Sequence, residues 1–294
     1  MSYDLWLYFE PAVRRDRLVE HFAARPNFSI TKDNVLYNNK NTGVYFFMRL
    51  RTALRLFHTN VVSAEFEINY HRPSFFGIEA EQVLSDFVAS FQPRIEDPQM
   101  HGMGEGPYSR DGFLSGWNFG NVFAARNSLS AGSNVASMPR DRLHGAWHWN
   151  YHRVERERHN PNLFVPEIAF FRVEGLPSRV VVWGEGMPIL LPQVDYVLVG
   201  RVVSGDARFG LARWSEVLEV IRRAGMDPTS DPVKLEYHVT PAPIADWVAD
   251  ITLINHDALE RLSADQILDD ELIAEARDFE TKVICDSSNA QGME

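Results

Sequence analysis

Cysteine is nearly missing from this sequence, because Cys285 is the only one among 294 residues. One cysteine excludes an internal disulfide and any zinc site built from several cysteines. The first residues also lack a basic segment followed by an apolar one, so we expect no signal peptide. These absences favour a protein of the reducing cytoplasm.

Long apolar runs are missing as well. The longest lies near residues 187–203 and is interrupted by prolines, Gln193, Asp195 and Arg201. A membrane-spanning helix needs about 20 consecutive apolar residues. We therefore expect no membrane span, and the composition of 45% hydrophobic and 23% charged residues is that of an ordinary globular chain.

Catalytic motifs are also lacking. The glycines of residues 101–106 do not lead into Gly-Lys-Ser/Thr, and their spacing does not match a dinucleotide-binding loop. The serines between 128 and 137 stand in no nucleophile elbow, and Cys285 lies among acids that disfavour a thiolate. We predict no catalytic residue, and this favours a non-enzymatic protein without a cofactor.

Negative charge is abundant, and it is concentrated near the end of the chain. The formal net charge is −11, and residues 241–294 contribute −10 of it through 13 acidic and three basic residues. Such a segment repels nucleic acid and anionic membranes and attracts basic proteins, although a solvated helical face is the simpler alternative. We therefore expect a basic protein partner and neither nucleic acid nor membrane.

The apolar spacing of residues 257–280 predicts a helix with a dense carboxylate surface. Neighbouring like charges destabilise a helix by a few tenths of a kcal/mol per pair, and a basic partner would relieve this cost. The predicted partner-binding residues are Asp265, Asp269, Asp270, Glu271, Glu275, Asp278 and Glu280.

Histidines cluster in residues 144–159, which hold four of the ten in the chain. In a helix, His144, His148 and His152 would share one face with Glu155 nearby, a spacing that can hold a divalent metal such as zinc. A strand suits the alternating tryptophans equally well, and packing is the simpler interpretation. A metal-dependent enzyme or metal-binding module is therefore the alternative function. A third is a small-molecule cleft lined by Trp147, Trp149 and Tyr151, for which core packing is again simpler.

The order of strand and helix patterns predicts an α+β fold, with a mainly antiparallel sheet and helices packed on one face. The expected division is an N-terminal α+β lobe at residues 1–125, an irregular His/Trp-rich connection at 126–161, and a C-terminal α+β lobe with an acidic helical tail at 162–294. The second lobe loosely repeats the order of the first, so either two similar lobes pack together or one large sheet runs through both.

Several segments together resemble a known group of proteins. They are Ser2-Tyr-Asp-Leu-Trp-Leu-Tyr-Phe9, the turn and strand of residues 37–46, Asn162-Leu-Phe-Val-Pro-Glu-Ile168, Val182-Trp183 and residues 189–196. The combination is similar to uncharacterised bacterial cytoplasmic proteins associated with immunity proteins, which are encoded beside secreted or contact-delivered toxins. The resemblance spans most of the chain, but its motifs are strands and turns. It implies a non-enzymatic protein whose acidic surface covers the active site of a basic toxin.

Overall fold

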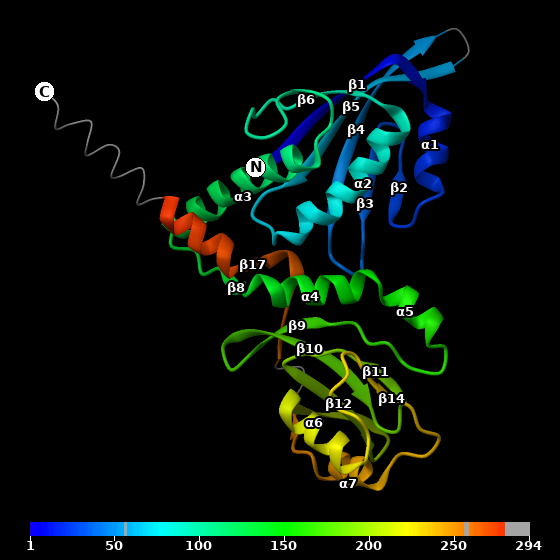
Figure 1. The fold of residues 1–294 in the computed structure, drawn as a ribbon, viewed down its shortest axis with the longest axis vertical. Helices are drawn as coiled ribbons and strands as arrows, with labels where there is room; N and C mark the ends of the chain where they lie inside the picture. The colour runs from blue at the N-terminus through cyan, green and yellow to red at the C-terminus, as the bar shows by residue number, and fades with distance from the viewer. Residues whose placement is uncertain (56–57, 256–258, 280–294) are drawn as a thin grey trace, which may run out of the picture. The chain divides into compact units, whose positions relative to one another are not determined.

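The chain folds into two compact units in a computed structural model, which describes residues 1–55, 58–255 and 259–279 (Figure 1). Unit 1 combines Met1–Leu143 with the chain from Asp265 onward, and unit 2 is His144–Ala264. Unit 2 is therefore an insertion in the sequence of unit 1. Both units contain helices and sheets, so the protein is α+β, as the sequence predicts.

A seven-stranded antiparallel sheet forms the centre of unit 1. Its strand order is β2-β3-β4-β5-β1-β6-β7. The strands are β1 (Ser2–Arg14), β2 (Phe28–Ile30), β3 (Asn34–Asn38), β4 (Tyr45–Arg55), β5 (His58–Asn69), β6 (Arg94–Glu96) and β7 (Glu105–Gly106). The hairpin turn predicted at residues 39–43 joins β3 to β4.

Helices cover one face of this sheet. Alternate residues of β1, among them Tyr3, Leu5 and Leu7, are fully buried, whereas Trp6 on the opposite face is exposed. The covering helices are α1 (Arg15–Ala23), α2 (Phe75–Phe91) and α3 (Arg110–Ser130). Ring contacts join Phe9 of β1 to Phe87 of α2, and Tyr3 to Phe113 of α3. The predicted one-sided packing is confirmed for unit 1.

A buried carboxylate fastens the β3–β4 turn to α2. Glu79 of α2 is fully buried, and its Oε1 accepts hydrogen bonds from Tyr37 Oη, Asn39 Nδ2 and Thr42 Oγ1 at 2.8, 2.8 and 3.1 Å. Three donors from one hairpin satisfy an acceptor that would otherwise be costly to bury.

The many glycines of residues 92–161 predict irregular structure, but three of them lie in a long helix. Gly112, Gly116 and Gly120 recur every four residues and lie in α3. A Cβ atom at Gly120 would lie 2.1 Å from the Tyr70 ring, and one at Gly116 would lie 2.5 Å from Tyr3 Oη. These glycines therefore allow α3 to approach the two tyrosines closely.

The C-terminal segment returns to unit 1. Strand β17 (Ile267–Asp269) pairs in parallel with β8 (Ala136–Met138), and residues 270–279 then form a helix (Figure 1). The sequence predicts helical structure over residues 257–280, with Ser263-Ala-Asp265 able to cap a second helix after a short break; this is wrong for the described residues 259–269. In place of helix, β16 (Glu260–Leu262) pairs with β9 (Ala169–Val173), and a 3₁₀ turn at Ala264–Gln266 leads into β17.

Unit 2 has its own six-stranded sheet, in the order β15-β13-β12-β10-β9-β16. Its pairs are antiparallel except for the central pair of β10 and β12. The remaining strands are β10 (Leu176–Gly184), β12 (Tyr196–Val203), β13 (Asp206–Arg213) and β15 (Leu253–Ile254). A separate pair joins β11 (Ile189–Leu191) to β14 (Val233–Leu235). The predicted strands at 163–173 and 234–240 are shorter in the structure.

The apolar spacing of helix α6 (Trp214–Arg223) predicts that Val217, Leu218 and Ile221 face the core; the structure buries Val217, Val220 and Ile221 and leaves Leu218 partly exposed. Near it in sequence, α7 (Ala242–Asp250) contributes Trp247, whose ring lies 6.2 Å from that of Trp183. The sequence pattern from Ile244 onward predicts a largely helical chain, but between α7 and residue 270 the described residues form the short strands β15, β16 and β17 and a 3₁₀ turn. Among the described residues, no helix is both long and apolar enough to cross a membrane.

The interval 126–161, expected to be irregular, is mostly helical. It holds the end of α3, the short strand β8, α4 (Arg140–Tyr151) and α5 (Arg153–His159). The boundary between the two units falls inside α4, after Leu143. The structure thus differs from the predicted division at residues 125 and 162. The glycines of α3 pack within a helix that continues past residue 125, and the acidic tail belongs to unit 1.

Candidate functional site

The predicted acidic residues fall into two structural groups. Asp265, Asp269 and Glu271 contact other parts of unit 1, whereas Asp270, Glu275 and Asp278 are exposed on the helix of residues 270–279. Glu280 lies outside the described residues.

Asp269 is fully buried, so its prediction as a partner-binding residue is wrong. Its carboxylate accepts a hydrogen bond from Ser74 Oγ at 2.6 Å and another from the Ser74 backbone N–H at 2.7 Å. Arg140 Nε donates to it at 3.4 Å. Ser74 precedes α2, so Asp269 also neutralises donors at the positive end of that helix. Asp269 is a structural clamp.

Two more carboxylates strengthen this attachment. Asp265 lies 3.7 Å from Arg72 Nε, and both side chains are only about one-fifth exposed. Glu271 Oε2 accepts a hydrogen bond from the backbone N–H of Arg140, the first residue of α4, at 3.1 Å. Glu271 itself remains exposed. The C-terminal segment is therefore fixed to unit 1 by three carboxylates as well as by β17.

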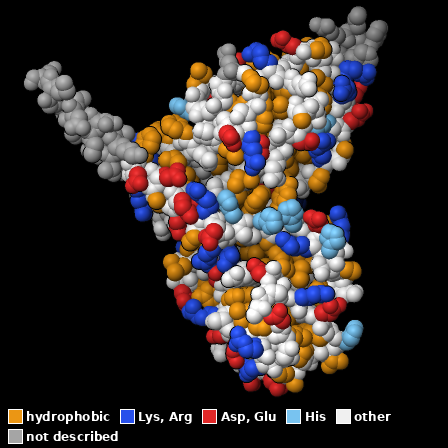
Figure 2. All heavy atoms as spheres, in the orientation of Figure 1, with side chains coloured by type: hydrophobic (Ala, Val, Ile, Leu, Met, Phe, Trp, Pro, Cys, Tyr) orange, Lys and Arg blue, Asp and Glu red, His pale blue; other side chains and the backbone are white. Residues whose placement is uncertain are grey.

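Apolar packing fixes the orientation of the helix that follows. Leu272, Ile273 and Ala276 are buried in a cluster with Ala125 of α3 and Leu268 of β17. The opposite side carries Asp270, Glu271, Glu275 and Asp278, which we name the acidic face (Figure 2). Within the described residues, Asp270, Glu275 and Asp278 form no ion pair.

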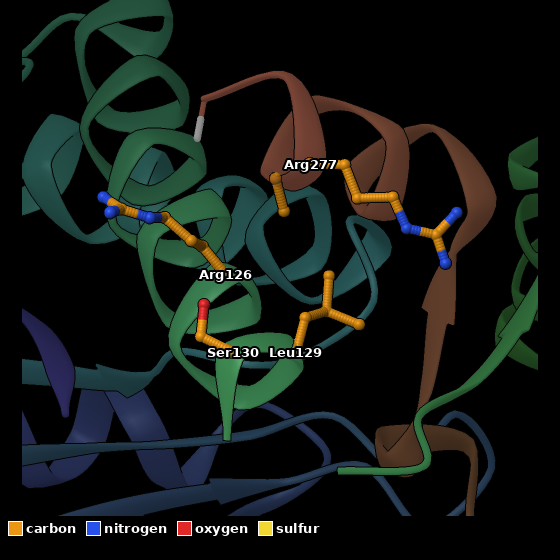
Figure 3. A pocket seen from close by; sticks show the side chains of 5 residues that line it. Arg126, Leu129, Ser130 and Arg277 are labelled. Atoms are coloured by element: carbon orange, nitrogen blue, oxygen red, sulfur yellow. The ribbon is translucent and has the colours of Figure 1, made fainter. Parts of the chain in front are cut away.

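A cavity of about 320 Å³ lies between the end of α3 and this helix. It is lined by Arg126, Leu129, Ser130, Ala276 and Arg277 (Figure 3). The guanidinium groups of the two arginines point to opposite sides of the cavity, while Leu129 points towards the neighbouring helix (Figure 3). The two cations do not converge on one point, and Leu129 and Ala276 supply the apolar part of a mixed lining.

The histidine stretch is helical, so the structure resolves the choice between helix and strand. The rings of His148 and His152 lie 4.6 Å apart, and His152 Nδ1 lies 3.3 Å from Glu155 Oε2. The ring of His144 contacts Trp147, at 6.3 Å between centroids. The structure brings two of the three predicted histidines together with Glu155.

The environment of His148 lowers its pKa, mainly because partial burial disfavours the charged imidazolium and secondarily because His152 and Arg156 are cationic neighbours. Neutral imidazole is the form that binds metals. Among the described residues, no group of three or more histidine, cysteine or carboxylate side chains is arranged to hold a metal.

The tryptophans proposed as a cleft lining have a packing role in part. Trp149 is buried and donates a hydrogen bond to the carbonyl of Pro166 at 2.7 Å. Its neighbour Asn150 bonds the backbone of Ile168 twice, at 2.9 Å each. These contacts hold α4 against residues 166–168, so Trp149 does not line a cleft.

Comparison of the chain with protein-family models, with curated proteins and with solved structures gave no match. The candidate site therefore has to be judged by its own geometry.

Sequence reasoning missed the residues that position the acidic face. Ser74, Arg72 and Arg140 lie 129–195 positions before their carboxylate partners, and no local pattern connects them. The alternation of apolar and charged residues in 270–279 can be recognised in the sequence. No sequence pattern indicates that aromatic residues of α3 lie on the surface beside that helix.

Proposed function

We propose that this chain is a non-enzymatic, cytoplasmic protein-binding protein whose acidic face docks on a basic protein. The observation that supports this proposal is the fixed orientation of the 270–279 helix. Its apolar side is buried against α3, and the buried clamp of Asp269 precedes it, so the carboxylates on its outer side share one direction.

Fixed charges favour this function for a physical reason. Carboxylates held on one rigid helix need little further ordering when a partner binds. Their joint potential increases the rate of encounter with a cationic surface and selects against acidic partners. The resemblance to immunity proteins makes a basic toxin the proposed partner, with the acidic face covering its active site.

The experiment compares three forms of the full chain for binding to the product of a neighbouring toxin gene. The first is the unaltered protein. The second carries Asp270→Lys, Glu275→Lys and Asp278→Lys. The third is a control with Glu219→Lys, Asp246→Lys and Asp250→Lys, which reverses three exposed carboxylates of unit 2.

We expect the reversal of Asp270, Glu275 and Asp278 to abolish binding and the unit 2 control to retain it. Binding should also weaken between about 0.01 M and about 1 M salt, as the Debye length falls from about 30 Å to about 3 Å. Equal loss of binding in both triple variants would show that only net charge matters. Unchanged binding in the variant with Asp270, Glu275 and Asp278 reversed would remove the acidic face from the interface.

A metal-binding module is the second candidate, supported by the 4.6 Å separation of the His148 and His152 rings. Elemental analysis of protein purified without chelator is its test. Stoichiometric zinc that is lost in His148→Ala but retained in His159→Ala would support this candidate, and metal-free protein would count against it.

A further inference from the structure

An exposed aromatic patch lies beside the acidic face. Phe119 and Phe123 are one turn apart on the outer side of α3, and each is 41% exposed. The ring of His101 lies 4.2 Å from Phe119, and the ring of Phe279 lies 6.3 Å from it. We name these four residues the aromatic patch. Figure 2 shows hydrophobic side chains over this part of unit 1, next to carboxylates.

Burial elsewhere on α3 makes this exposure notable. The other side of the helix buries Phe113 completely beside Tyr3 and Phe66 of the sheet, and Trp117 completely beside Gly77 of α2, so the core does not lack aromatic residues. Phe119 and Phe123 are on the side that faces away from that core. Adjacent exposed aromatic side chains mark sites of interaction more often than scattered ones do.

The patch is continuous with both the acidic face and the cavity. Phe279 ends the described part of the helix that carries the acidic face, and Asp278 is its direct neighbour. The Arg126 guanidinium lies 5.3 Å from the centre of the Phe279 ring, and the same Arg126 lines the cavity of about 320 Å³. Aromatic anchors, a cavity that can receive an apolar side chain, and a charged rim are the usual parts of a protein-binding hot spot.

We propose that the aromatic patch is the apolar centre of the docking surface, and that its occupant is a basic protein presenting an apolar side chain bordered by lysine or arginine. This inference rests on the proposed function of the acidic face. Charge complementarity selects the occupant, because the helix of residues 270–279 carries four carboxylates and one arginine. The carboxylates orient the partner, and the phenylalanines make an apolar contact from which water is excluded.

The test uses a labelled amphipathic peptide of lysine and leucine as the probe and the full chain as the receptor. Phe119→Ser and Phe123→Ser are compared with Phe47→Ser, a matched control because Phe47 is also 41% exposed but lies on the open face of the unit 1 sheet. We expect each patch variant to weaken binding by about tenfold and the control to leave it unchanged. Equal unfolding midpoints would show that the variants remain folded.

Other results would overturn the inference. A lysine–serine peptide that binds as tightly, with no effect of Phe119→Ser, would show that charge alone acts. The acidic face would then still be supported if the Asp270, Glu275 and Asp278 reversal abolished binding. If that reversal also had no effect, the proposed function would fail together with the inference.

Two further outcomes would assign the patch to another occupant and also overturn the inference. One is a dimer in light scattering that Phe119→Ser dissociates, which would identify a second copy of this chain. The other is tighter peptide binding when residues 280–294 are removed, which would identify the chain's own residues 280–294 as the occupant.

Discussion

Asp269 accepts two hydrogen bonds from Ser74, a residue 195 positions earlier in the chain. This contact joins the C-terminal segment to the start of α2, and Arg140 completes it from the start of α4. Among the contacts that attach the acidic face to unit 1, Asp269 is the carboxylate that is fully buried.

Removal of that carboxylate should destabilise the protein strongly. Asp269→Ala removes a fully buried carboxylate together with its two hydrogen bonds from the part-buried Ser74 and its ion pair with Arg140, and we expect a loss of about 3 kcal/mol in the free energy of unfolding. Urea denaturation measures it. Asp278→Ala on the exposed side of the same helix is the control and should stay within about 0.5 kcal/mol of the unaltered protein. Equal effects of the two would contradict the clamp.

Two glycine substitutions should act in opposite directions. Gly120→Ala places a Cβ 2.1 Å from the Tyr70 ring, so we expect a destabilisation of about 1–3 kcal/mol from overpacking. Gly145→Ala in α4 meets only Arg179 Nη1, at 4.0 Å, and should stabilise by about 0.4–1 kcal/mol because it reduces the entropy of the unfolded chain. Thermal unfolding of both variants checks the pair. Stabilisation by Gly120→Ala as well as by Gly145→Ala would show that α3 can shift away from Tyr70.

Loss of the buried Glu79 should loosen the β3–β4 hairpin. Glu79→Ala removes the shared acceptor of three donors, Tyr37 Oη, Asn39 Nδ2 and Thr42 Oγ1. We expect this to lower the free energy of unfolding by about 3 kcal/mol or more. We expect faster amide hydrogen exchange in residues 37–46 than in the sheet strands β1 and β5. Glu20→Ala, at an exposed position on α1, is the control. A uniform increase over the whole of unit 1 would mean that Glu79 has no local role.

Stability should decrease as the pH falls from about 7.5 to about 5. Burial lowers the pKa values of His21 and His71 below their usual 6.5, and the cationic neighbours Arg25 and Arg72 lower them further, although Asp86 partly opposes this at His21. Below pH 6.5 the unfolded chain therefore binds protons that the folded chain does not, and this favours unfolding.

Urea midpoints measured across this pH range would test the prediction. The variant His21→Leu with His71→Asn should show a flatter dependence on pH; asparagine is chosen because residue 71 has a positive φ of 61°. His159→Asn should retain the original dependence. A dependence that persists in the first variant would assign it to other groups.

Alkaline titration should separate buried tyrosines from exposed ones. Burial raises the pKa values of Tyr3, Tyr70 and Tyr108 above the usual 10.0, and the neighbouring carboxylates Asp97 and Glu81 raise those of Tyr3 and Tyr108 further. Because the unfolded chain loses these protons first, the stability that they provide is present below pH 10 and is lost as the pH rises above it. Tyrosinate absorbance should therefore increase in two steps, the second coinciding with unfolding. A single step near pH 10 would contradict this.

The parts of the fold that the sequence predicted are those with a short period. Alternation in β5, the turn at residues 39–43 and the apolar stripe of α6 each depend on residues close in the chain, and each is present. The glycines of α3 were misinterpreted because a glycine required for close packing looks, in sequence, the same as one required for a turn.

The candidate site was predictable only in part. Charge density identified the carboxylates, but the burial of Asp269 depends on Ser74 and Arg140, which are distant in sequence. In the same way, the exposure of Phe119 depends on which side of α3 meets the sheet. Residue composition supplies neither kind of information, since both follow from tertiary contacts.

The insertion of unit 2 within unit 1 has a consequence for synthesis on the ribosome. At about 5–20 residues per second, the 144–264 segment takes on the order of ten seconds to make. During that interval β8 has no β17 beside it, and Ala125 lacks Leu272 and Ile273. Unit 2 can thus be translated in full while unit 1 still awaits its closing strand, and the acidic face joins the molecule last. A newborn chain therefore passes through a stage in which that surface is not yet formed.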